Sequence, residues 1–419
     1  MKNKLLLTII ALAFIIRLVP MFFLSYPVEN DAPQYRDLGI SLAEHLQYSR
    51  DGINPSIERP PGYPVFLAVL YKFFGQGKQM VIFFQVLLST LTVWLTFWLS
   101  RLLTGKDKTA LWAAALVALY PLFIYYNLFL YSETYAVVLF LLSLIFLLKG
   151  AKSNDRRMFF WSGLAFVFFF LTKPIFAPAG ALYVAFVWLA LPRGAALKSL
   201  ALFMLPIVLV WGAWIGRNYK AFGTPLPFGV GLGPVLFGGN YPEFKAVWPG
   251  YDVVTKIAPP GNMSQIEYDA YLKSLAFKSI KENPGTTAKL FAYKAGKFLS
   301  TVRDFKEMVM FRGGSKNAFL LDVVFPILFQ AYKYSKIILS LLFLAGSALV
   351  LRRFKDKESH PMILVATVSA FSLLAHSMLY VDERYHLTTF PLHVILAIYA
   401  FELIRNKYKN ETINTDPSV

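Results

Sequence analysis

The feature that most constrains this chain is a series of apolar runs, several of which reach about 20 residues. As a helix, a run of that length can cross the hydrocarbon core of a bilayer. Of the 419 residues, 57% are hydrophobic and only 16% are charged, which is more apolar surface than a soluble domain can bury. The sequence therefore predicts an all-α, polytopic membrane protein with about ten transmembrane helices.

The expected spans cover most of the chain. The first run contains Arg17 and Pro20 and lacks a small-residue cleavage site, so we expect a retained helix rather than a signal peptide. The apolar runs place the spans at about 5–24, 79–103, 109–126, 129–149, 158–172, 175–191, 199–217, 326–351, 361–380 and 387–405.

The charges between the spans predict how the protein is oriented. The net charge is +18. Basic residues recur in alternate short connections and at both chain ends, namely Lys2, Lys4, Lys106, Lys108, Lys149, Lys152, Arg156, Arg157, Arg193, Lys198, Arg352, Arg353, Lys355, Lys357, Arg405, Lys407 and Lys409. The positive-inside rule assigns these segments to the cytoplasm. Because the charges are divided among membrane connections, contact with lipid headgroups explains them better than nucleic-acid binding does.

This orientation divides the chain into regions. We expect an N-terminal transmembrane module at 1–217, which includes a first outer loop at 25–78. An extracytoplasmic loop region follows at 218–325, then C-terminal transmembrane helices at 326–405 and a disordered cytoplasmic tail at 406–419. The protein is thus predicted to lie in the inner (plasma) membrane with both termini in the cytoplasm.

Both outer regions carry short helical patterns. In the first loop, apolar residues repeat at helical spacing over 35–46, and 63–74 is apolar but too short to span, so both segments fit interfacial helices. In the second region, Ser264 and Glu267 form a capping-box pattern, and Pro284 can begin a further helix that ends near Ser300.

Two charged groups stand out in the first outer loop. Asp31 directly follows the first span, where it is either a functional carboxylate or the N-cap of the next helix. Glu58 and Arg59 precede Pro60-Pro61-Gly62-Tyr63, a backbone-restricting segment that can present Arg59 to a phosphate. The alternative for this pair is a surface ion pair before an interfacial helix.

Further charged groups lie at span ends on the predicted outer face. Glu133 lies near the outer end of the fourth span and can meet a cation or metal, or simply reach water. Lys173, Arg217 with Asn218, and Arg384 with Tyr385 occupy other outer ends. Cations placed against the positive-inside trend favour an anionic ligand such as a lipid phosphate, with ordinary headgroup contact or snorkelling as the alternative.

Other chemistries find no support in the sequence. There are no cysteines, the five histidines show no metal-ligand spacing, and no phosphate-binding P-loop or Rossmann glycine pattern occurs. Use of a cytosolic nucleotide is therefore unsupported.

The order of these motifs resembles a known family. Asp31, the Arg59–Pro64 segment, Ser132-Glu133, Arg217-Asn218-Tyr219 and Arg384-Tyr385 are similar to the protein O-mannosyltransferase and aminoarabinose-transferase family of the glycosyltransferase C superfamily. The resemblance implies transfer of a sugar from a polyprenyl-phosphate carrier at the outer face, with inversion at the anomeric carbon. Where many members carry an acidic pair in the first loop, this chain has Asn30-Asp31.

The resemblance also implies roles for individual residues. Asp31 matches the proposed general base, and Glu58 with Arg59 matches an acidic–basic pair whose basic member meets the donor phosphate. Glu133 matches an acidic position near the donor, with a divalent metal as an option. Other substrate contacts would come from Tyr63, Lys173, Arg217, Asn218, Arg384 and Tyr385.

We therefore predict a membrane glycosyltransferase that requires no cofactor with certainty. Its partners would be a polyprenyl-phosphate sugar, a lipid, glycan or protein hydroxyl acceptor and membrane lipids, but no nucleic acid. Two alternatives stay open: a flippase or transporter of a lipid-linked glycan, and a polymerase or ligase that uses a diphosphate-linked oligosaccharide.

Overall fold

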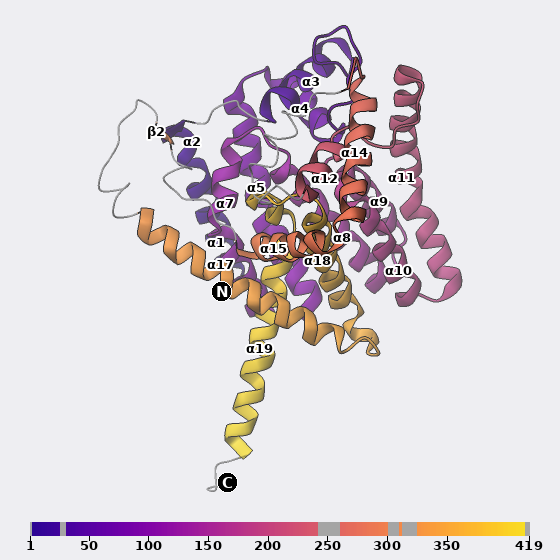
Figure 1. The fold of residues 1–419 in the computed structure, drawn as a ribbon. Helices are drawn as coiled ribbons and strands as arrows, with labels where there is room; N and C mark the ends of the chain where they lie inside the picture. The colour runs from indigo at the N-terminus through magenta and orange to yellow at the C-terminus, as the bar shows by residue number, and fades with distance from the viewer. Residues whose placement is uncertain (1, 26–30, 242–259, 301–309, 312–324, 415–419) are drawn as a thin grey trace.

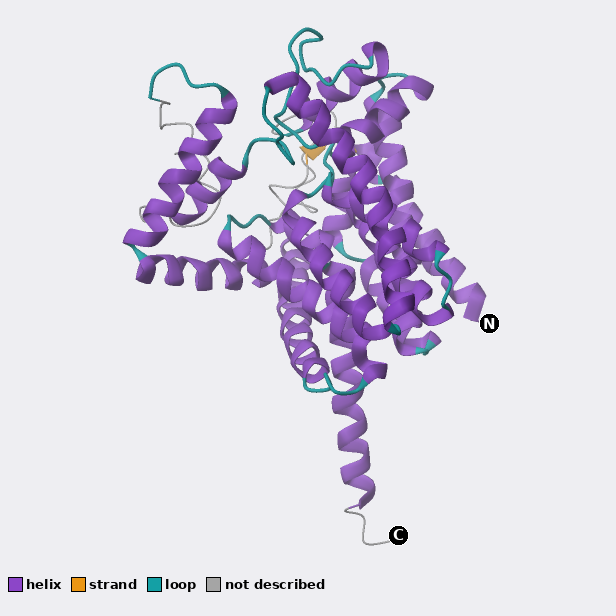
Figure 2. Ribbon diagram, turned by 90° about the vertical axis from the view of Figure 1, so that its right-hand side faces the viewer, coloured by secondary structure: helices purple, strands orange, loops and turns teal. Residues whose placement is uncertain are grey.

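The computed structural model describes residues 2–25, 31–241, 260–300, 310–311 and 325–414. These residues are almost entirely helical (Figures 1 and 2). The exception among them is an antiparallel pair of two-residue strands, in which Leu24 pairs with Phe311. The predicted all-α class is confirmed.

The helices and strands have the following bounds. The first part of the chain contains α1 (Lys2–Leu18), α2 (Pro20–Phe23), β1 (Leu24–Ser25), α3 (Ala32–His45), α4 (Gly62–Phe74), α5 (Lys78–Thr104), α6 (Asp107–Ala118), α7 (Pro121–Tyr125), η1 (Tyr126–Leu128), α8 (Glu133–Ser153), α9 (Arg157–Phe170), η2 (Pro174–Ala179), α10 (Gly180–Ala190) and α11 (Arg193–Phe222). The second part contains α12 (Leu232–Asn240), α14 (Gln265–Glu282), α15 (Pro284–Ser300), β2 (Met310–Phe311), α17 (Phe325–Leu351), η4 (Lys357–Ser359), α18 (His360–Met378), η5 (Glu383–Thr388) and α19 (Phe390–Asn414).

Six helical segments of the described chain are long and apolar enough to cross a membrane. They are α1 with the start of α2, α5, α8, α11, α17, and η4 with α18. The expected spans at 158–172, 175–191 and 387–405 correspond to α9, to η2 with α10, and to α19. These segments are helical but are not among the six. The six candidate spans make the chain polytopic, and the count of ten spans stays a prediction.

One expected span is broken. The sequence predicts a single helix at 109–126, but α6 and α7 meet at an angle of 55°. Pro121 starts the second piece and has no N–H to donate to the preceding turn. The buried Arg17 donates to the carbonyl oxygens of Val117 and Ala118 at 3.0 and 2.7 Å, which satisfies the open end of α6.

The ends of the bundle differ. Helices α3 and α4 of the first loop lie at one end, whereas the C-terminal part of α19 projects from the opposite end (Figure 1). Helix α19 continues to Asn414, into the segment 406–419 for which the sequence predicts disorder.

The first loop packs closely against the bundle at Gly62. Its N–H donates to the carbonyl of Leu171 at 3.0 Å, and a Cβ added at this position would lie 2.2 Å from Oγ1 of Thr172. Only glycine allows so close an approach, and this contact fixes the loop that carries Arg59 against the end of α9.

The segment 260–300 forms the two helices that the sequence predicts. The capping box between Ser264 and Glu267 is confirmed at the start of α14, and α15 runs from Pro284 to Ser300. Helix α12 packs against α14, and α15 packs against α18. Helices α12, α14 and α15 are thereby joined to α18, the helix that precedes Arg384.

Candidate active site at the end of the helix bundle

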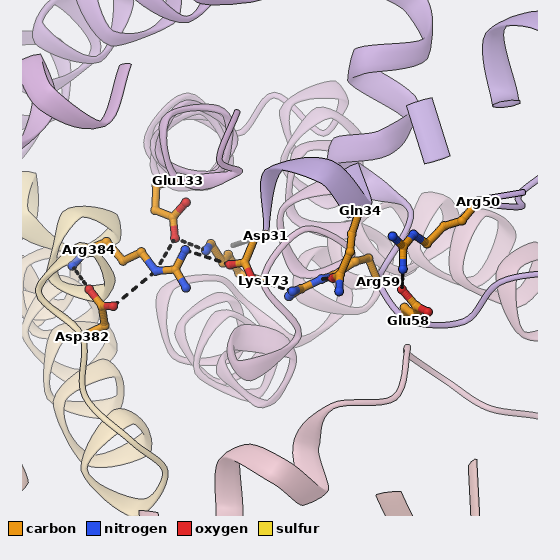
Figure 3. A network of polar contacts seen from close by, with 9 residues as sticks. All are labelled: Asp31, Gln34, Arg50, Glu58, Arg59, Glu133, Lys173, Asp382 and Arg384. Carbon is orange, nitrogen blue, oxygen red and sulfur yellow. Dashed lines mark hydrogen bonds and ion pairs between the residues drawn. The ribbon is translucent and has the colours of Figure 1, made fainter. Parts of the chain in front are cut away.

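Five charged side chains from separate parts of the sequence meet at the end of the bundle that carries α3 and α4 (Figure 3). Asp31 precedes α3, Arg59 precedes α4, Glu133 begins α8, Lys173 precedes η2 and Arg384 lies in η5. The sequence predicts each of them as a site residue, and the structure brings all five together.

Asp31 stands at the N-cap of α3, but its carboxylate makes no capping hydrogen bond. Instead, one oxygen accepts from Nη2 of Arg59 at 2.5 Å and the other from Nη1 of Arg384 at 2.8 Å. Burial alone would raise the pKa of Asp31, but the two guanidinium charges outweigh it and lower the pKa to about 2. The carboxylate is thus held ionised between two cations.

Glu133 forms the second acidic centre. Its Oε1 lies 2.7 Å from Nζ of Lys173 and 3.7 Å from Nε of Arg384. The Glu133 side chain is only 2% exposed, so its charge depends on these cations. Its other oxygen, Oε2, and Nε of Arg384 have no hydrogen-bond partner among the described residues. Arg384 therefore bridges the two carboxylates while retaining an open donor.

Neighbouring side chains fix the cations. Nε of Arg59 donates to Oε1 of Gln34 at 2.5 Å, and the guanidinium lies 5.3 Å from the centre of the Tyr35 ring. The Arg384 guanidinium lies over Tyr131, at 4.9 Å. None of these three residues, Gln34, Tyr35 and Tyr131, is among the predicted site residues. Gln34 and Tyr35 follow Asp31 by three and four positions, a helical spacing that could have indicated them.

Tyr385 lies beside the site as predicted, through its ring. The ring centre is 5.5 Å from the Arg384 guanidinium and 5.9 Å from the Lys173 ammonium. Asp382 accepts a hydrogen bond from the backbone N–H of Arg384 at 3.1 Å and so caps the turn that carries it. The turn is therefore held both in its backbone and in its side chains.

Two predicted contacts lie outside this cluster. Glu58 pairs with Arg50 at 2.9 Å and accepts from Gln265 at 3.1 Å, so it joins the first loop to the start of α14 instead of pairing with Arg59. Tyr63 is fully buried, and its hydroxyl donates to Gln85 at 2.8 Å. Among the described residues, neither side chain has a hydrogen bond or ion pair to the five-residue cluster in these contacts, and Tyr63 faces inward where the first turn of α4 packs against the bundle.

Arg217 and Asn218 also stand apart from the cluster. The Arg217 guanidinium donates to the carbonyls of Tyr48 and Ser56, both at 2.9 Å, and Asn218 donates to the carbonyl of Leu226 at 2.8 Å. These bonds hold the first loop and the chain after α11. Arg217 also lines a cavity of about 250 Å³ between α4, α9 and α11, whose walls are mostly apolar.

A divalent metal at Glu133 would find one carboxylate oxygen there, Oε2, that has no hydrogen-bond partner among the described residues. In the part of the chain that the structure describes, no three acidic or histidine side chains gather as a ligand set. Both Asp31 oxygens and Oε1 of Glu133 already face cationic groups. An added metal ion would lie among Arg59, Lys173 and Arg384, where charge repulsion opposes its binding.

Comparison with known proteins supports the resemblance. Residues 58–214 match the family model described as dolichyl-phosphate-mannose-protein mannosyltransferase. No curated protein sequence matches the chain.

Solved structures share the fold. The oligosaccharyltransferase AglB of Archaeoglobus fulgidus, in complex with an inhibitory peptide and a dolichol-phosphate, aligns with a TM-score of 0.53 at 12% identity and covers 100% of this chain and 52% of that one. The apo form of the Archaeoglobus fulgidus oligosaccharyltransferase gives 0.53 at 14% identity, with 97% and 51% covered. ArnT of Cupriavidus metallidurans, bound to undecaprenyl phosphate, gives 0.46 at 14% identity, with 94% and 60% covered.

The chain spans about half the length of the oligosaccharyltransferases that it matches. The predicted resemblance is confirmed: this membrane protein has the fold of the archaeal oligosaccharyltransferase, and over residues 58–214 it carries the sequence pattern of the dolichyl-phosphate-mannose-protein mannosyltransferase family.

Proposed function

We propose that this chain is a glycosyltransferase that moves a sugar from a polyprenyl-phosphate donor to a hydroxyl of a lipid, glycan or protein. Its active site would be the cluster around Asp31, on the extracytoplasmic face of the inner (plasma) membrane. The observation that carries the proposal is the Asp31 carboxylate held between Arg59 and Arg384 at one end of a membrane helix bundle. The family match over residues 58–214 supports the reaction class.

The arginines of the cluster suit a phosphate group. Three cations, Arg59, Lys173 and Arg384, face the carboxylates of Asp31 and Glu133, and the Asp382 carboxylate lies 3.7 Å from Arg384, so these six charges balance before a donor binds. A sugar attached to a polyprenyl phosphate is a phosphodiester with one negative charge, whereas a diphosphate carrier brings two. The two guanidinium groups can bind phosphate oxygens with charge-assisted hydrogen bonds, which strengthen where water is scarce.

The mostly apolar cavity that Arg217 lines suits the carrier's hydrocarbon chain. It opens between Pro61, Gly62 and Val65 of the first loop and Phe168 and Trp214 of the bundle. Because Arg59 directly precedes this segment, a phosphate at Arg59 could be followed by isoprene units in the cavity. Burial of each methylene there would stabilise the bound carrier by about 0.8 kcal/mol.

The reaction requires one base and one leaving group. The acceptor oxygen attacks the anomeric carbon, the bond from that carbon to the phosphate oxygen breaks, and the electron pair leaves with the phosphate. The acceptor proton passes to the Asp31 carboxylate. Attack opposite the leaving group inverts the anomeric carbon.

The low pKa of Asp31 has a mechanistic consequence. With a pKa of about 2, the carboxylate is a weak base while both arginines bind it. A donor phosphate would draw Arg59 and Arg384 toward itself, which removes positive charge from Asp31 and raises its basicity. Donor binding would thus activate the base, so deprotonation of the acceptor would follow donor binding.

Replacement of Arg59 with glutamine tests phosphate binding. We expect affinity for farnesyl phosphate, measured in lipid nanodiscs, to fall by roughly 10- to 100-fold, the equivalent of one charged hydrogen bond. Arg36→Gln, at an exposed arginine of α3 that pairs with Asp37, is the matched control and should bind normally. Equal affinity of the Arg59 variant and the wild type would oppose the proposal.

Removal of divalent metal is expected to leave sugar transfer unchanged. Lys173 and Arg384 already supply the positive charge that a metal would bring to Glu133. Initial rates with excess chelator should equal those without it. If chelation abolishes transfer and added Mg²⁺ or Mn²⁺ restores it, the cations of the cluster do not replace a metal.

A further inference from the structure

We propose that Lys294 is a positioning residue that holds the turn carrying Arg384 in its working place. The inference rests on the proposed function, because it concerns the donor-phosphate contact. Lys294 lies on α15 of the outer region, and Arg384 lies in the turn after α18.

The Lys294 ammonium is buried and binds backbone carbonyls. Its Nζ lies 2.7 Å from the carbonyl oxygens of Gly239 and Leu379 and 3.5 Å from that of Met378. The residue is 0% exposed. Met378 and Leu379 stand at the C-terminal end of α18, where open carbonyls and the helix dipole favour a cation.

Two further contacts join the end of α12 to the C-terminal end of α18. Nδ2 of Asn240 donates to the carbonyl of Met378 at 2.7 Å. A Cβ added at Gly239 would lie 2.0 Å from the carbonyl oxygen of Leu379, so the end of α12 touches the end of α18 backbone to backbone. Helices α12 and α15 of the outer region therefore both bind the C-terminal end of α18.

The C-terminal end of α18 lies only a few residues before Arg384 of the active site. Only the residues from Tyr380 to Glu383 separate Leu379 from Arg384, and Asp382 caps the Arg384 backbone N–H at 3.1 Å. A displaced Leu379 would therefore move Arg384, whose Nη1 lies 2.8 Å from Asp31. A misplacement of about 1 Å at a reacting centre can cost about 100-fold in rate.

A buried lysine is a costly way to fill space. A methionine would occupy a similar volume without the desolvation of a charge. Unlike methionine, the ammonium has three N–H groups, which can bind carbonyls from two different segments at once and so hold those segments in place. Docking of the outer region is in this way coupled to the placement of the phosphate-binding guanidinium.

A double-mutant cycle tests the coupling. We expect Lys294→Met to weaken binding of farnesyl phosphate by about 10-fold, the lower range for residues that orient a contact group. In an Arg384→Gln background, the same change should alter the affinity by less than about twofold, because its effect passes through Arg384. Lys294→Arg, which keeps a cation with several donors, should recover most of the binding.

Two controls keep the result interpretable. Lys289→Met, at an exposed lysine of α15, should leave binding unchanged. Gly239→Ala should reproduce the Lys294→Met loss by pushing on the Leu379 carbonyl, whereas Gly296→Ala, where a Cβ meets nothing within 4 Å, should not.

The outcomes separate this inference from the proposed function. Equal losses from Lys294→Met in both backgrounds, or no loss in either, would overturn the positioning role even if the wild type transfers sugar. A coupled loss of farnesyl phosphate binding without any sugar transfer by the wild type would retain the positioning role and remove the proposed function. Absence of binding by the wild type would overturn both.

Discussion

Replacement of Asp31 with asparagine is expected to lower the rate of sugar transfer by about 10²- to 10⁴-fold, the usual contribution of a general base. Asparagine has nearly the same shape but cannot accept the acceptor's proton. Donor affinity should persist or rise, because Arg59 and Arg384 lose the carboxylate that competes with the donor phosphate. Single-turnover transfer from a labelled donor, measured beside donor binding, separates these two effects.

The control for this change is Asp37→Asn. Asp37 lies on the same helix and pairs with Arg36 at the surface, so its loss should leave transfer near the wild-type rate. Undiminished transfer by Asp31→Asn would keep the enzyme class but remove Asp31 from the role of base. A simultaneous loss of donor binding would instead identify Asp31 as a residue that orders the arginines.

The second large effect concerns stability. Lys173→Met should destabilise the protein by roughly 3–5 kcal/mol, the usual cost of breaking a buried ion pair. The change leaves the Glu133 carboxylate, only 2% exposed, without its partner at 2.7 Å. Arg384 lies farther from the same oxygen, at 3.7 Å, and can compensate only in part. Denaturant unfolding in detergent micelles measures the loss, with the exposed Lys72→Met as the control.

A compensating change makes this prediction specific. Lys173→Met combined with Glu133→Gln removes both charges, so the double variant should recover much of the stability that the single variant loses. If the two changes destabilise additively, the pair is not the reason for the loss, and packing around Lys173 is the better explanation.

The sequence predicts the members of the site better than their contacts. Asp31 and Arg384 are 353 positions apart, yet both were expected at outer ends of spans, and a bundle brings such ends together. The distribution of Lys and Arg between the spans predicts the side of the membrane but not the direction of a side chain. For that reason Tyr63 was expected as a substrate contact and Arg217 as a phosphate contact, although Tyr63 binds Gln85 and Arg217 binds loop carbonyls.

The residues that the sequence could not reveal share a physical cause. Lys294 lies on a helix with two other lysines, Lys289 and Lys297, and nothing in the local sequence distinguishes a buried ammonium from a solvated one. The sequence gives Arg17 of the first span no role, but its guanidinium donates hydrogen bonds to the open carbonyls at the end of α6. Both side chains bind backbone carbonyls of distant segments, and the sequence does not show where in space those carbonyls lie.

The most direct test of the central claim follows a labelled sugar and its carrier in the same vesicles. Purified protein in proteoliposomes would receive labelled polyprenyl-phosphate sugars and acceptors from envelope extract. The proposed function predicts that label passes to the acceptor while free polyprenyl monophosphate appears in equal amount, and that neither occurs with Asp31→Asn. Label that crosses the bilayer still attached to its carrier, with no release of monophosphate, would contradict the account and identify a flippase.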